Sequence, residues 1–397
     1  MPSVTPGYCF TLGTNSFGAL GLGEDVVEKP RAAHVDVAGK RLLGVACGGM
    51  HTVALAEDGS IYTWGVNDEG ALGRPTSGSA WGQRPTAAKR THMCQARLPD
   101  GVVCVQVVAG DGFTFVLTDQ GCIYGWGQFK DDLSSFCSFS PDVQLQRLPA
   151  LVYQAEDKRD RVRKLAAGAR HMLALTRRGE VLSWGMAGQG QLGRMPPADV
   201  LLRPTAVKGI AAALGPNVTD IGVGSYASFA IGTHGVVAAW GLNNGGQLGL
   251  PLAAADDVDQ CVWEPAAVPA LGMRVRAVAG GDHHSLALTR DNKVLSFGSS
   301  NYGMLGRLDI PQPVLRRPSA CLTLSQEGVS IAAGMGVSSC VTESGNAFTW
   351  GSNVNYQMAK GQVEADNVQP TRMRRHTAFG KRRVLQFCFG GQHAALL

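Results

Sequence analysis

Gly48-Gly-Met-His-Thr-Val-Ala-Leu55 begins the clearest copy of a pattern that recurs along the whole chain, and Asp58-Gly59, Ile61-Tyr-Thr-Trp-Gly65 and Gly70-Ala-Leu-Gly73 complete it. The leading glycine recurs at Gly48, Gly110, Gly168, Gly224, Gly281, Gly334 and Gly390. A second glycine follows after a constant 17 residues at Gly65, Gly127, Gly185, Gly241, Gly298 and Gly351. One interval kept in six copies indicates a repeated structural unit.

The first half of each copy has the signature of a β-hairpin. In the copy above, residues 51–56 and 61–64 are rich in β-branched and aromatic residues, and the turn between them contains Asp58-Gly59. This is the strongest short-range signal for a hairpin. A unit of about 50–60 residues built from short antiparallel strands matches one blade of a β-propeller. We therefore predict an all-β fold over residues 1–397, a single seven-bladed β-propeller with four-stranded antiparallel blades.

The two ends of the chain carry complementary halves of the seventh copy. Residues 390–397 match the first half and stop where the hairpin partner would begin. Tyr8-Cys-Phe-Thr-Leu-Gly13 and Gly18-Ala-Leu-Gly21 match the second half. A propeller closes on itself so that no sheet edge stays open. We expect both termini to share one composite blade, and a truncation at either end to destroy the fold.

Composition favours a soluble, intracellular protein and excludes several classes. Hydrophobic residues are 45% and charged residues only 17% of the 397 residues, enough to bury a large core. No apolar run reaches the ~18 residues of a membrane span, and no signal peptide opens the chain. The ten cysteines show no zinc-type spacing, which predicts reduced thiols and no metal or other cofactor. A net charge of +5 decides nothing by itself.

The residues that recur at fixed places in the copies are interpreted as structural. Five tryptophans precede the second glycine: Trp64, Trp126, Trp184, Trp240 and Trp350. One position holds His51, His171, His284 and His393 in four copies, and Phe113, Ala227 and Val337 in the others. A catalytic or metal-binding role would not tolerate these replacements. The sequence also has no Walker A loop, H-E-x-x-H motif or serine nucleophile elbow, so we do not expect an enzyme.

Polar residues that vary between copies gather on one predicted face of the ring. In an antiparallel hairpin the start of the first strand and the end of the second lie at the same edge. The residue before each histidine position and the loop after each Trp-Gly pair therefore project from one side. That side carries Asp68, Glu69, Asp111, Lys130, Asp131, Asp132, Arg170, Arg194, Tyr226, Asn243, His283 and Tyr302. The residues alone leave two interpretations open, a solvated polar rim and a protein-binding surface.

The second blade departs most from the pattern. After Gly125-Trp-Gly127, residues 128–141 replace the expected Gly-x-Leu-Gly and contain several phenylalanines and charges. We expect residues 128–147 to form an inserted wedge that protrudes from the same face. Exposed side chains such as Phe129 are predicted at its start.

Several of these motifs resemble the regulator of chromosome condensation family. They are Gly48-Gly-Met-His-Thr52, Asn67-Asp-Glu-Gly-Ala-Leu-Gly-Arg74, Phe129-Lys-Asp131, Gly190-Gln-Leu-Gly-Arg194, Gly281-Asp-His-His284 and Gly390-Gly-Gln-His393. The resemblance covers essentially the whole chain. It implies a nuclear, chromatin-associated and monomeric guanine-nucleotide exchange factor for the small GTPase Ran. Such a factor stabilises the nucleotide-free GTPase and performs no covalent chemistry.

The resemblance also implies which residues contact partners. The GTPase-binding set is Asp111, Phe129, Lys130, Asp131, Arg170, Arg194 and His283, with Asp68, Glu69, Tyr226 and Asn243 as further candidates. For nucleosome or DNA binding the residues stay open: the basic loops 158–164, 372–376 and 381–383 offer phosphate contacts and are equally typical of solvated loops between blades. Phosphate contacts made by such loops weaken as salt concentration rises.

Two departures from the family keep an alternative open. Arg170 stands where the family has an acidic residue before the third-blade histidine, and Ser16 replaces an acid in the composite blade. At ~4 Å and an effective dielectric constant of ~20, each unit of charge contributes up to ~4 kcal/mol. Either nearby acids such as Asp111, Asp131 and Asp132 compensate, or the protein is a scaffold that binds a GTPase or another protein without effective exchange.

Overall fold

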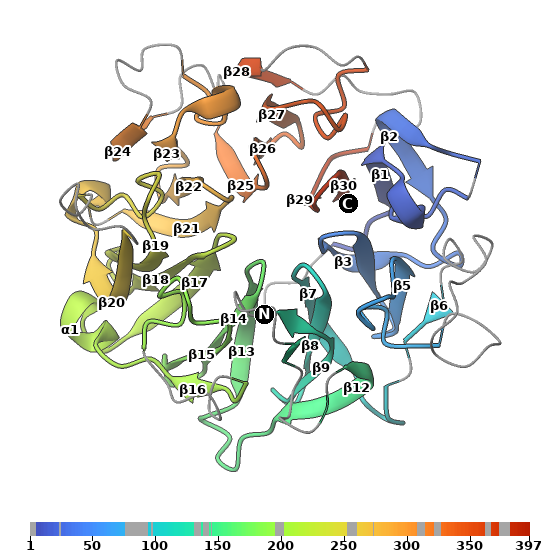
Figure 1. Ribbon diagram of the computed structural model, residues 1–397, viewed down its shortest axis with the longest axis horizontal. Coiled ribbons are helices and arrows are strands. Elements are labelled where there is room, and N and C mark those ends of the chain that lie inside the picture. Colours follow the sequence, from blue (N-terminus) through green and yellow to red (C-terminus); the bar gives the residue numbers. More distant parts are fainter. Residues whose placement is uncertain are drawn as a thin grey trace.

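Seven four-stranded antiparallel sheets stand around a central axis, which confirms the predicted propeller (Figure 1). The computed structural model describes residues 5–23, 25–75, 94–96, 98–130, 136–137, 143, 145–194, 202–251, 260–272, 274–307, 314–320, 327–361, 367–372 and 382–397. Its short helical turns are α1 (Ile210–Leu214), η1 (Ser16–Gly18), η4 (Pro269–Leu271) and η5 (Asn301–Gly303). None of the helices in these ranges has the length and apolar character needed to cross a membrane.

Six blades are formed by consecutive strands. Blade 1 contains β3 (Leu42–Cys47), β4 (His51–Ala56), β5 (Ile61–Gly65) and β6 (Cys94–Gln95). Blade 2 contains β7 (Cys104–Ala109), β8 (Phe113–Thr118), β9 (Ile123–Gly127) and β12 (Gln146–Tyr153). Blade 3 contains β13 (Val162–Ala167), β14 (His171–Thr176), β15 (Val181–Gly185) and β16 (Thr205–Ala206). Blade 4 contains β17 (Val218–Val223), β18 (Ala227–Gly232), β19 (Val237–Leu242) and β20 (Cys261–Ala267). Blade 5 contains β21 (Val275–Gly280), β22 (His284–Thr289), β23 (Val294–Ser299) and β24 (Val314–Ala320). Blade 6 contains β25 (Gly328–Ala333), β26 (Val337–Thr342), β27 (Ala347–Gly351) and β28 (Asn367–Arg372).

The seventh blade combines strands from both ends of the chain. Its two inner strands are β29 (Phe387–Phe389) and β30 (His393–Leu396), and its two outer strands are β1 (Cys9–Thr14) and β2 (Glu28–Val35). Phe10 pairs with Leu396 and Gly13 with His393 across the β1–β30 ladder. Figure 1 shows these N-terminal strands in blue beside the C-terminal strands in red. The predicted composite blade is therefore confirmed.

A repeated hydrogen-bond cluster fastens one blade to the next. Between blades 3 and 4, His171 Nε2 lies 2.8 Å from Ser228 Oγ, and this hydroxyl donates to the carbonyl of Gln191. Trp240 Nε1 donates to the same carbonyl at 3.0 Å. Because the hydroxyl hydrogen is directed to the carbonyl, the imidazole donates at Nε2. The same cluster recurs as His393–Thr52–Ala19–Trp64, His51–Thr114–Ala71–Trp126 and His284–Ser338–Met304–Trp350.

These fastening residues are buried and neutral, which confirms their structural interpretation. The four histidines and five tryptophans are at most 1% exposed. Burial lowers the pKa of His51, His171 and His284 to about 3 and that of His393 to about 4. The leading glycine is needed because a Cβ at Gly48 would lie 2.1 Å from Cε1 of His51.

The junction of blades 2 and 3 is fastened differently. Phe113 takes the histidine position, and Met172 takes the position of the serine or threonine. The ring centroids of Phe113 and Phe129 are 4.4 Å apart, and those of Phe115 and Trp184 are 5.4 Å apart. Blade 2 lacks the Gly-x-Leu-Gly loop that supplies the acceptor carbonyl elsewhere, and Trp184 Nε1 has no hydrogen-bond partner among the described residues. An apolar aromatic cluster thus replaces the polar one.

The inserted segment begins as a short antiparallel hairpin. β10 (Phe129–Lys130) pairs with β11 (Phe136–Cys137), with Phe129 opposite Cys137. The Phe129 side chain is 1% exposed, so the expectation of an exposed phenylalanine here is wrong. It anchors the hairpin in the core because the missing loop leaves room beside Phe113. Residues 131–135, 138–142 and 144 of the predicted wedge 128–147 lie outside the described residues.

Candidate functional site

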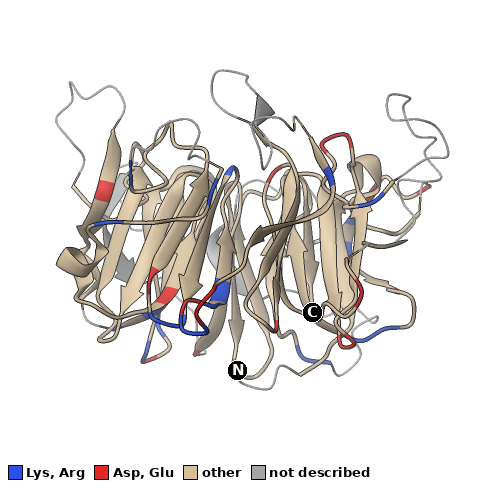
Figure 2. Ribbon diagram, turned by 90° about the horizontal axis from the view of Figure 1, so that it is seen from below, with Lys and Arg blue, Asp and Glu red and all other residues tan. Residues whose placement is uncertain are grey.

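One face of the ring is formed by two kinds of loop that lie side by side. In blade 1, the backbone N–H of Val66, in the loop after β5, donates to the carbonyl of Met50, just before β4. In blades 4 and 5, Asn244 Oδ1 lies 3.3 Å from His283 Nδ1. This geometry agrees with the common face that the sequence predicts. In the side view of Figure 2, charged loops beside the N-terminus belong to the opposite face.

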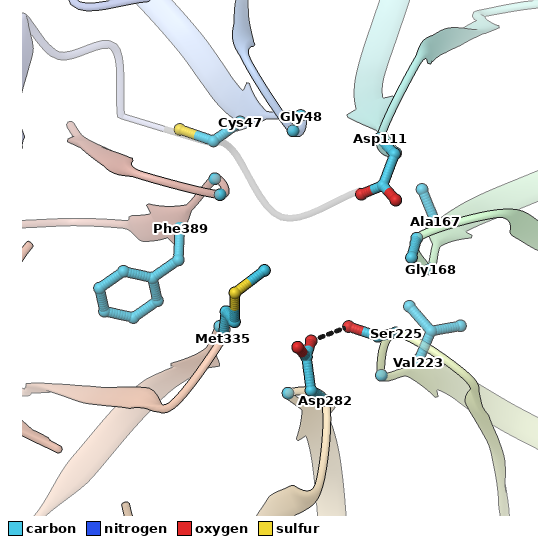
Figure 3. Close-up of a pocket in the computed structure, with 18 of the residues that line it drawn as sticks. Cys47, Gly48, Asp111, Ala167, Gly168, Val223, Ser225, Asp282, Met335 and Phe389 are labelled. Atoms are coloured by element: carbon cyan, nitrogen blue, oxygen red, sulfur yellow. Dashed lines mark hydrogen bonds between the residues drawn. The ribbon is translucent and has the colours of Figure 1, made fainter. Parts of the chain in front are cut away.

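The centre of this face is the mouth of the channel. The leading-glycine turns of the seven blades surround a hollow of about 140 Å³. Asp111 of blade 2, Asp282 of blade 5 and Met335 of blade 6 follow the leading glycines and line it (Figure 3). The Ser225 hydroxyl donates to the Asp282 carboxylate. The mouth therefore presents two carboxylates from separate blades.

An acidic cluster with one arginine lies beside the mouth, over blades 1 to 3. A small pocket there is lined by Glu69, Asp111, Gln128 and Arg170. Arg170 Nε lies 3.8 Å from Asp111 Oδ2, and the two side chains are 30% and 54% exposed. Asp111, one of the acids that the sequence suggested as compensation for Arg170, therefore lies within ion-pair distance of it. A loose, exposed ion pair of this kind contributes about 0–1 kcal/mol, so both groups remain available to a partner.

Exposed apolar side chains occupy the other half of the face. Tyr302, Met335, Val354, Phe17 and Met50 are all at least 43% exposed. Tyr302 lies close to the Met335 turn, since a Cβ on Gly336 would be 3.8 Å from Tyr302 Cδ2. Phe17 and Tyr302 occupy equivalent loop positions with φ of 61° and 57°, which is uncommon for bulky residues. The face therefore has a charged sector and an apolar sector, as protein-binding surfaces often do.

Six of the candidate residues lie at this face with accessible side chains. Asp68, Asp111 and His283 are exposed, and Glu69, Arg170 and Tyr226 are partly buried. Lys130 belongs to β10, where only the backbone is described. Asp131 and Asp132 lie outside the described residues.

One candidate, Asn243, is corrected because its side chain braces its loop from within, and a second, Arg194, is partly buried against its own blade. Asn243 is 2% exposed; its Oδ1 accepts from the Leu248 backbone N–H at 3.1 Å. Asn67 makes the equivalent bond in blade 1. Arg194 donates to Ser183 Oγ and to the Ser183 carbonyl. These three residues recur with the repeat, which explains their presence without a partner.

Arg74 provides the matching observation for Arg194. Its Nε and Nη2 donate to the hydroxyl and carbonyl of Thr63 in blade 1. Arg194 makes the same pair of bonds to Ser183 in blade 3. The Nε and Nη2 atoms of Arg194 therefore brace blade 3. The residue is still partly exposed, so its contact with a partner stays a prediction.

The sequence reasoning missed two residues at the mouth, Asp282 and Met335. Both occupy the position directly after a leading glycine, the same position as Asp111. Comparing all seven copies at that offset would have found them. In the described part of the chain, no three His, Cys, Asp or Glu residues gather into a metal site.

Comparisons with known proteins show which family this chain belongs to. The RCC1-like domain, a class of seven-fold repeat propellers, matches residues 8–396. The regulator of chromosome condensation of Homo sapiens is 32% identical over 424 residues, covering 100% of this chain and 91% of that protein. The chain belongs to the regulator of chromosome condensation family.

Yeast relatives extend this comparison to a solved structure. The guanine nucleotide exchange factor SRM1 of Saccharomyces cerevisiae is 29% identical, covering 98% of this chain and 87% of that protein. The crystal structure of Prp20p from the same organism, reported with its binding properties to Gsp1p and histones, aligns with a TM-score of 0.87. It is 28% identical and covers 99% of this chain and 92% of that one.

Proposed function

We propose that this protein is a guanine-nucleotide exchange factor for the small GTPase Ran, acting in the nucleus at chromatin. The observation that carries the proposal is the pair of carboxylates at the channel mouth, Asp111 and Asp282, with Glu69 in the pocket beside Asp111. Membership of a family that includes a named exchange factor supports it. So does a related structure studied with a GTPase partner and histones.

Exchange requires only that the protein bind the empty GTPase better than the loaded one. A nucleotide held at nanomolar affinity represents about 12 kcal/mol of binding free energy. Each ~1.4 kcal/mol of preference for the empty state raises the rate of release about tenfold. No covalent bond of the nucleotide changes, so the chain needs binding residues and no nucleophile.

The carboxylates suit this task because of what a departing nucleotide leaves behind. The phosphate-binding loop of a GTPase holds a lysine that pairs with the nucleotide phosphates. When the nucleotide leaves, that positive charge loses its partner. Asp111 and Glu69 lie at an accessible pocket on the face and supply negative charge there. In this proposal Lys130 and Asp131 of the wedge make adjoining contacts with the GTPase.

Arg170 opposes the attraction between these carboxylates and a cation of the GTPase, and it thereby limits the rate of nucleotide release. Its guanidinium lies beside Asp111, so it competes with a cation of the GTPase for the same carboxylate. We expect Arg170→Asp to accelerate release of fluorescent GDP from Ran by about tenfold or more relative to the unchanged chain.

The decisive experiment measures GDP release from Ran with the unchanged chain, Asp111→Asn and a control. Asp111→Asn removes the charge and keeps the shape, and we expect release to slow about tenfold. Asp291→Asn is the matched control, because Asp291 pairs with Lys293 on the opposite face. Release no faster than without the protein, for the unchanged chain and Arg170→Asp alike, would contradict the proposal.

A second candidate function is a GTPase-binding scaffold without effective exchange. The Arg170–Asp111 pair favours it, because it neutralises part of the acidic sector. An exchange factor forms a tight complex with empty Ran that GDP or GTP dissolves, whereas a scaffold ignores the nucleotide. Size-exclusion chromatography of the mixture, with and without GDP, distinguishes the two and also tests whether the protein is a monomer.

The proposal assigns chromatin binding to the opposite face, because that face carries exposed cations. Lys158 and Arg177 are exposed there, whereas Arg178 and Arg159 are paired with Asp157. Phosphate contacts by the unpaired cations make binding salt-dependent. We expect the double variant Lys158→Ala/Arg177→Ala to weaken nucleosome binding and to flatten its salt dependence, measured by fluorescence anisotropy.

A further inference from the structure

Three thiols gather where the composite blade meets blade 1. Cys47 ends β3, Cys388 lies in β29, and Cys9 begins β1. The Sγ atoms of Cys47 and Cys388 are 3.1 Å apart. All three belong to the apolar cluster that fills this seam. The seam is also the place where the ring is closed by strands from opposite ends of the chain.

The geometry points to a modification site: we propose that Cys47 and Cys388 form a reversible disulfide that covalently closes the ring. A disulfide bond is about 2.05 Å long, so the two sulfur atoms need to approach by only ~1 Å. Their strands already pack against each other as the inner strands of neighbouring blades. This proposal does not depend on the proposed exchange activity.

In this proposal a small oxidant enters through the channel, because Cys47 is 9% exposed and lines the hollow at the mouth. Cys388 is partly exposed, and Cys9 is 1% exposed. Figure 3 shows Cys47 at the edge of the hollow, with its sulfur turned away from the centre of the hollow. The oxidant class that fits this entry is a peroxide.

The reaction balances with one molecule of hydrogen peroxide. The Cys47 sulfur attacks a peroxide oxygen, the O–O bond breaks, and a sulfenic acid and one water form. The Cys388 sulfur then attacks the Cys47 sulfur, the S–O bond breaks, and the disulfide and a second water form. The two thiols lose two electrons and two protons, and the peroxide gains them. A dithiol reductant reverses the step by thiol–disulfide exchange.

The surroundings of the pair set the conditions for the reaction. Burial raises the pKa of the Cys47 thiol, and its contact with Cys388 adds to this shift. The thiol therefore stays protonated at neutral pH, and the protonated form is the less reactive one. The pair remains reduced in a reducing compartment and closes on sustained exposure to peroxide.

The bond would constrain a very long stretch of chain. The two cysteines are 341 residues apart in sequence, and a cross-link restricts the unfolded chain more as the enclosed loop lengthens. It also ties blade 1 to the composite blade at the seam. We expect the melting temperature to rise by on the order of 5 °C on oxidation.

The test uses the full chain treated with hydrogen peroxide, followed by alkylation of the remaining thiols. Mass spectrometry of a non-reduced digest should find the peptide of Cys47 joined to that of Cys388. The melting temperature should rise and return to its starting value after dithiothreitol. Cys388→Ala and Cys388→Ser should each abolish both effects, and Cys122→Ala, at a partly exposed thiol in another blade, should keep them.

Other results overturn the proposal. The bond is excluded if Cys47 and Cys388 still react with the alkylating agent after peroxide treatment, or if they are oxidised only to separate sulfinic acids. A Cys47 peptide joined to a cysteine other than Cys388 would do the same. A cross-link between the two that leaves the melting temperature unchanged would refute the ring-closing role.

Discussion

The junction of blades 3 and 4 and the junction of blades 2 and 3 hold the same architecture by different chemistry. The first uses His171, Ser228 and Trp240 around one loop carbonyl. The second uses Phe113 and Phe129 in an apolar cluster. The loop that supplies the carbonyl in the first junction is the one replaced by the β10–β11 hairpin in the second. Blade 2 therefore has a hairpin in place of this loop, and an aromatic cluster in place of the polar one.

Other junctions show which partners depend on each other. In blade 6 the histidine is replaced by Val337, and the next blade has Ala394 in place of the hydroxyl residue. In blade 4 the histidine is replaced by Ala227, but Ser285 of the next blade is kept and still donates to the carbonyl of Gln247. The hydroxyl-to-carbonyl bond is thus the more general part of the cluster, and the histidine is the addition that introduces a titratable group.

The largest expected effect is a loss of protein stability in acid, caused by the buried histidines of the polar junctions. The folded pKa values of about 3 to 4 for the four buried histidines lie below an unfolded value of ~6.5. Below pH 6.5 the unfolded chain binds protons that the folded chain excludes, so stability falls as pH falls towards the folded pKa. We expect a loss on the order of 5 kcal/mol between pH 8 and pH 5.5, measured by urea denaturation.

A variant that copies one junction onto another sharpens this test. His171→Phe/Ser228→Met gives blades 3 and 4 the residues of the blade 2–3 junction and removes one titrating group. The slope of stability against pH should fall by up to ~1.4 kcal/mol per pH unit. An unchanged slope in a folded variant would show that His171 does not titrate as described.

The aromatic junction is broken by Phe129→Ala. The side chain is buried beside Phe113 and Phe115, so we expect a loss of about 3–5 kcal/mol in the free energy of unfolding. Phe17→Ala on the same face is the control, because Phe17 is 52% exposed, and it should change stability by less than ~0.5 kcal/mol. Equal effects in the two variants would argue against the anchoring role of Phe129.

The smallest expected effect compares two tryptophans. Trp240→Phe and Trp184→Phe remove similar ring volume, but among the described residues Trp240 has a hydrogen bond to lose and Trp184 has none. Trp240→Phe should therefore destabilise the protein by about 1 kcal/mol more. A larger loss for Trp184→Phe would mean that its indole N–H has a partner in the segment beyond the described residues.

The fold was predictable because residues with the same structural role recur at equivalent positions in several copies of the repeat. A leading glycine is kept where His51 and the next blade leave no room for a Cβ. Four of the five tryptophans lie where a loop carbonyl accepts a hydrogen bond from the indole N–H. The composite blade followed from matching two half-copies. The anchoring role of Phe129 was not predictable in this way, since the missing Gly-x-Leu-Gly loop occurs once and has no other copy for comparison.

The face was predictable, but the direction of individual side chains was not. The hairpin geometry placed Asp111 and His283 on the correct face, because they lie two residues and one residue before a buried strand. Asn243 and Arg194 have the polarity of surface residues, yet Asn243 binds a loop N–H and Arg194 binds Ser183 of β15. Comparison with Asn67 and Arg74 in blade 1 would have revealed this, since a residue repeated at one offset usually serves the repeat.

The shared seventh blade has a consequence for synthesis of the protein. β1 ends at Thr14, and its inner partner β30 begins only at His393. At 5–20 residues per second, the ribosome needs roughly 20–75 s to join them. During that time the first strands emerge with no neighbour for one edge, and the growing ring stays open. An unpaired strand edge is a template for pairing with another chain, so β1 stays open to such pairing until translation is nearly finished.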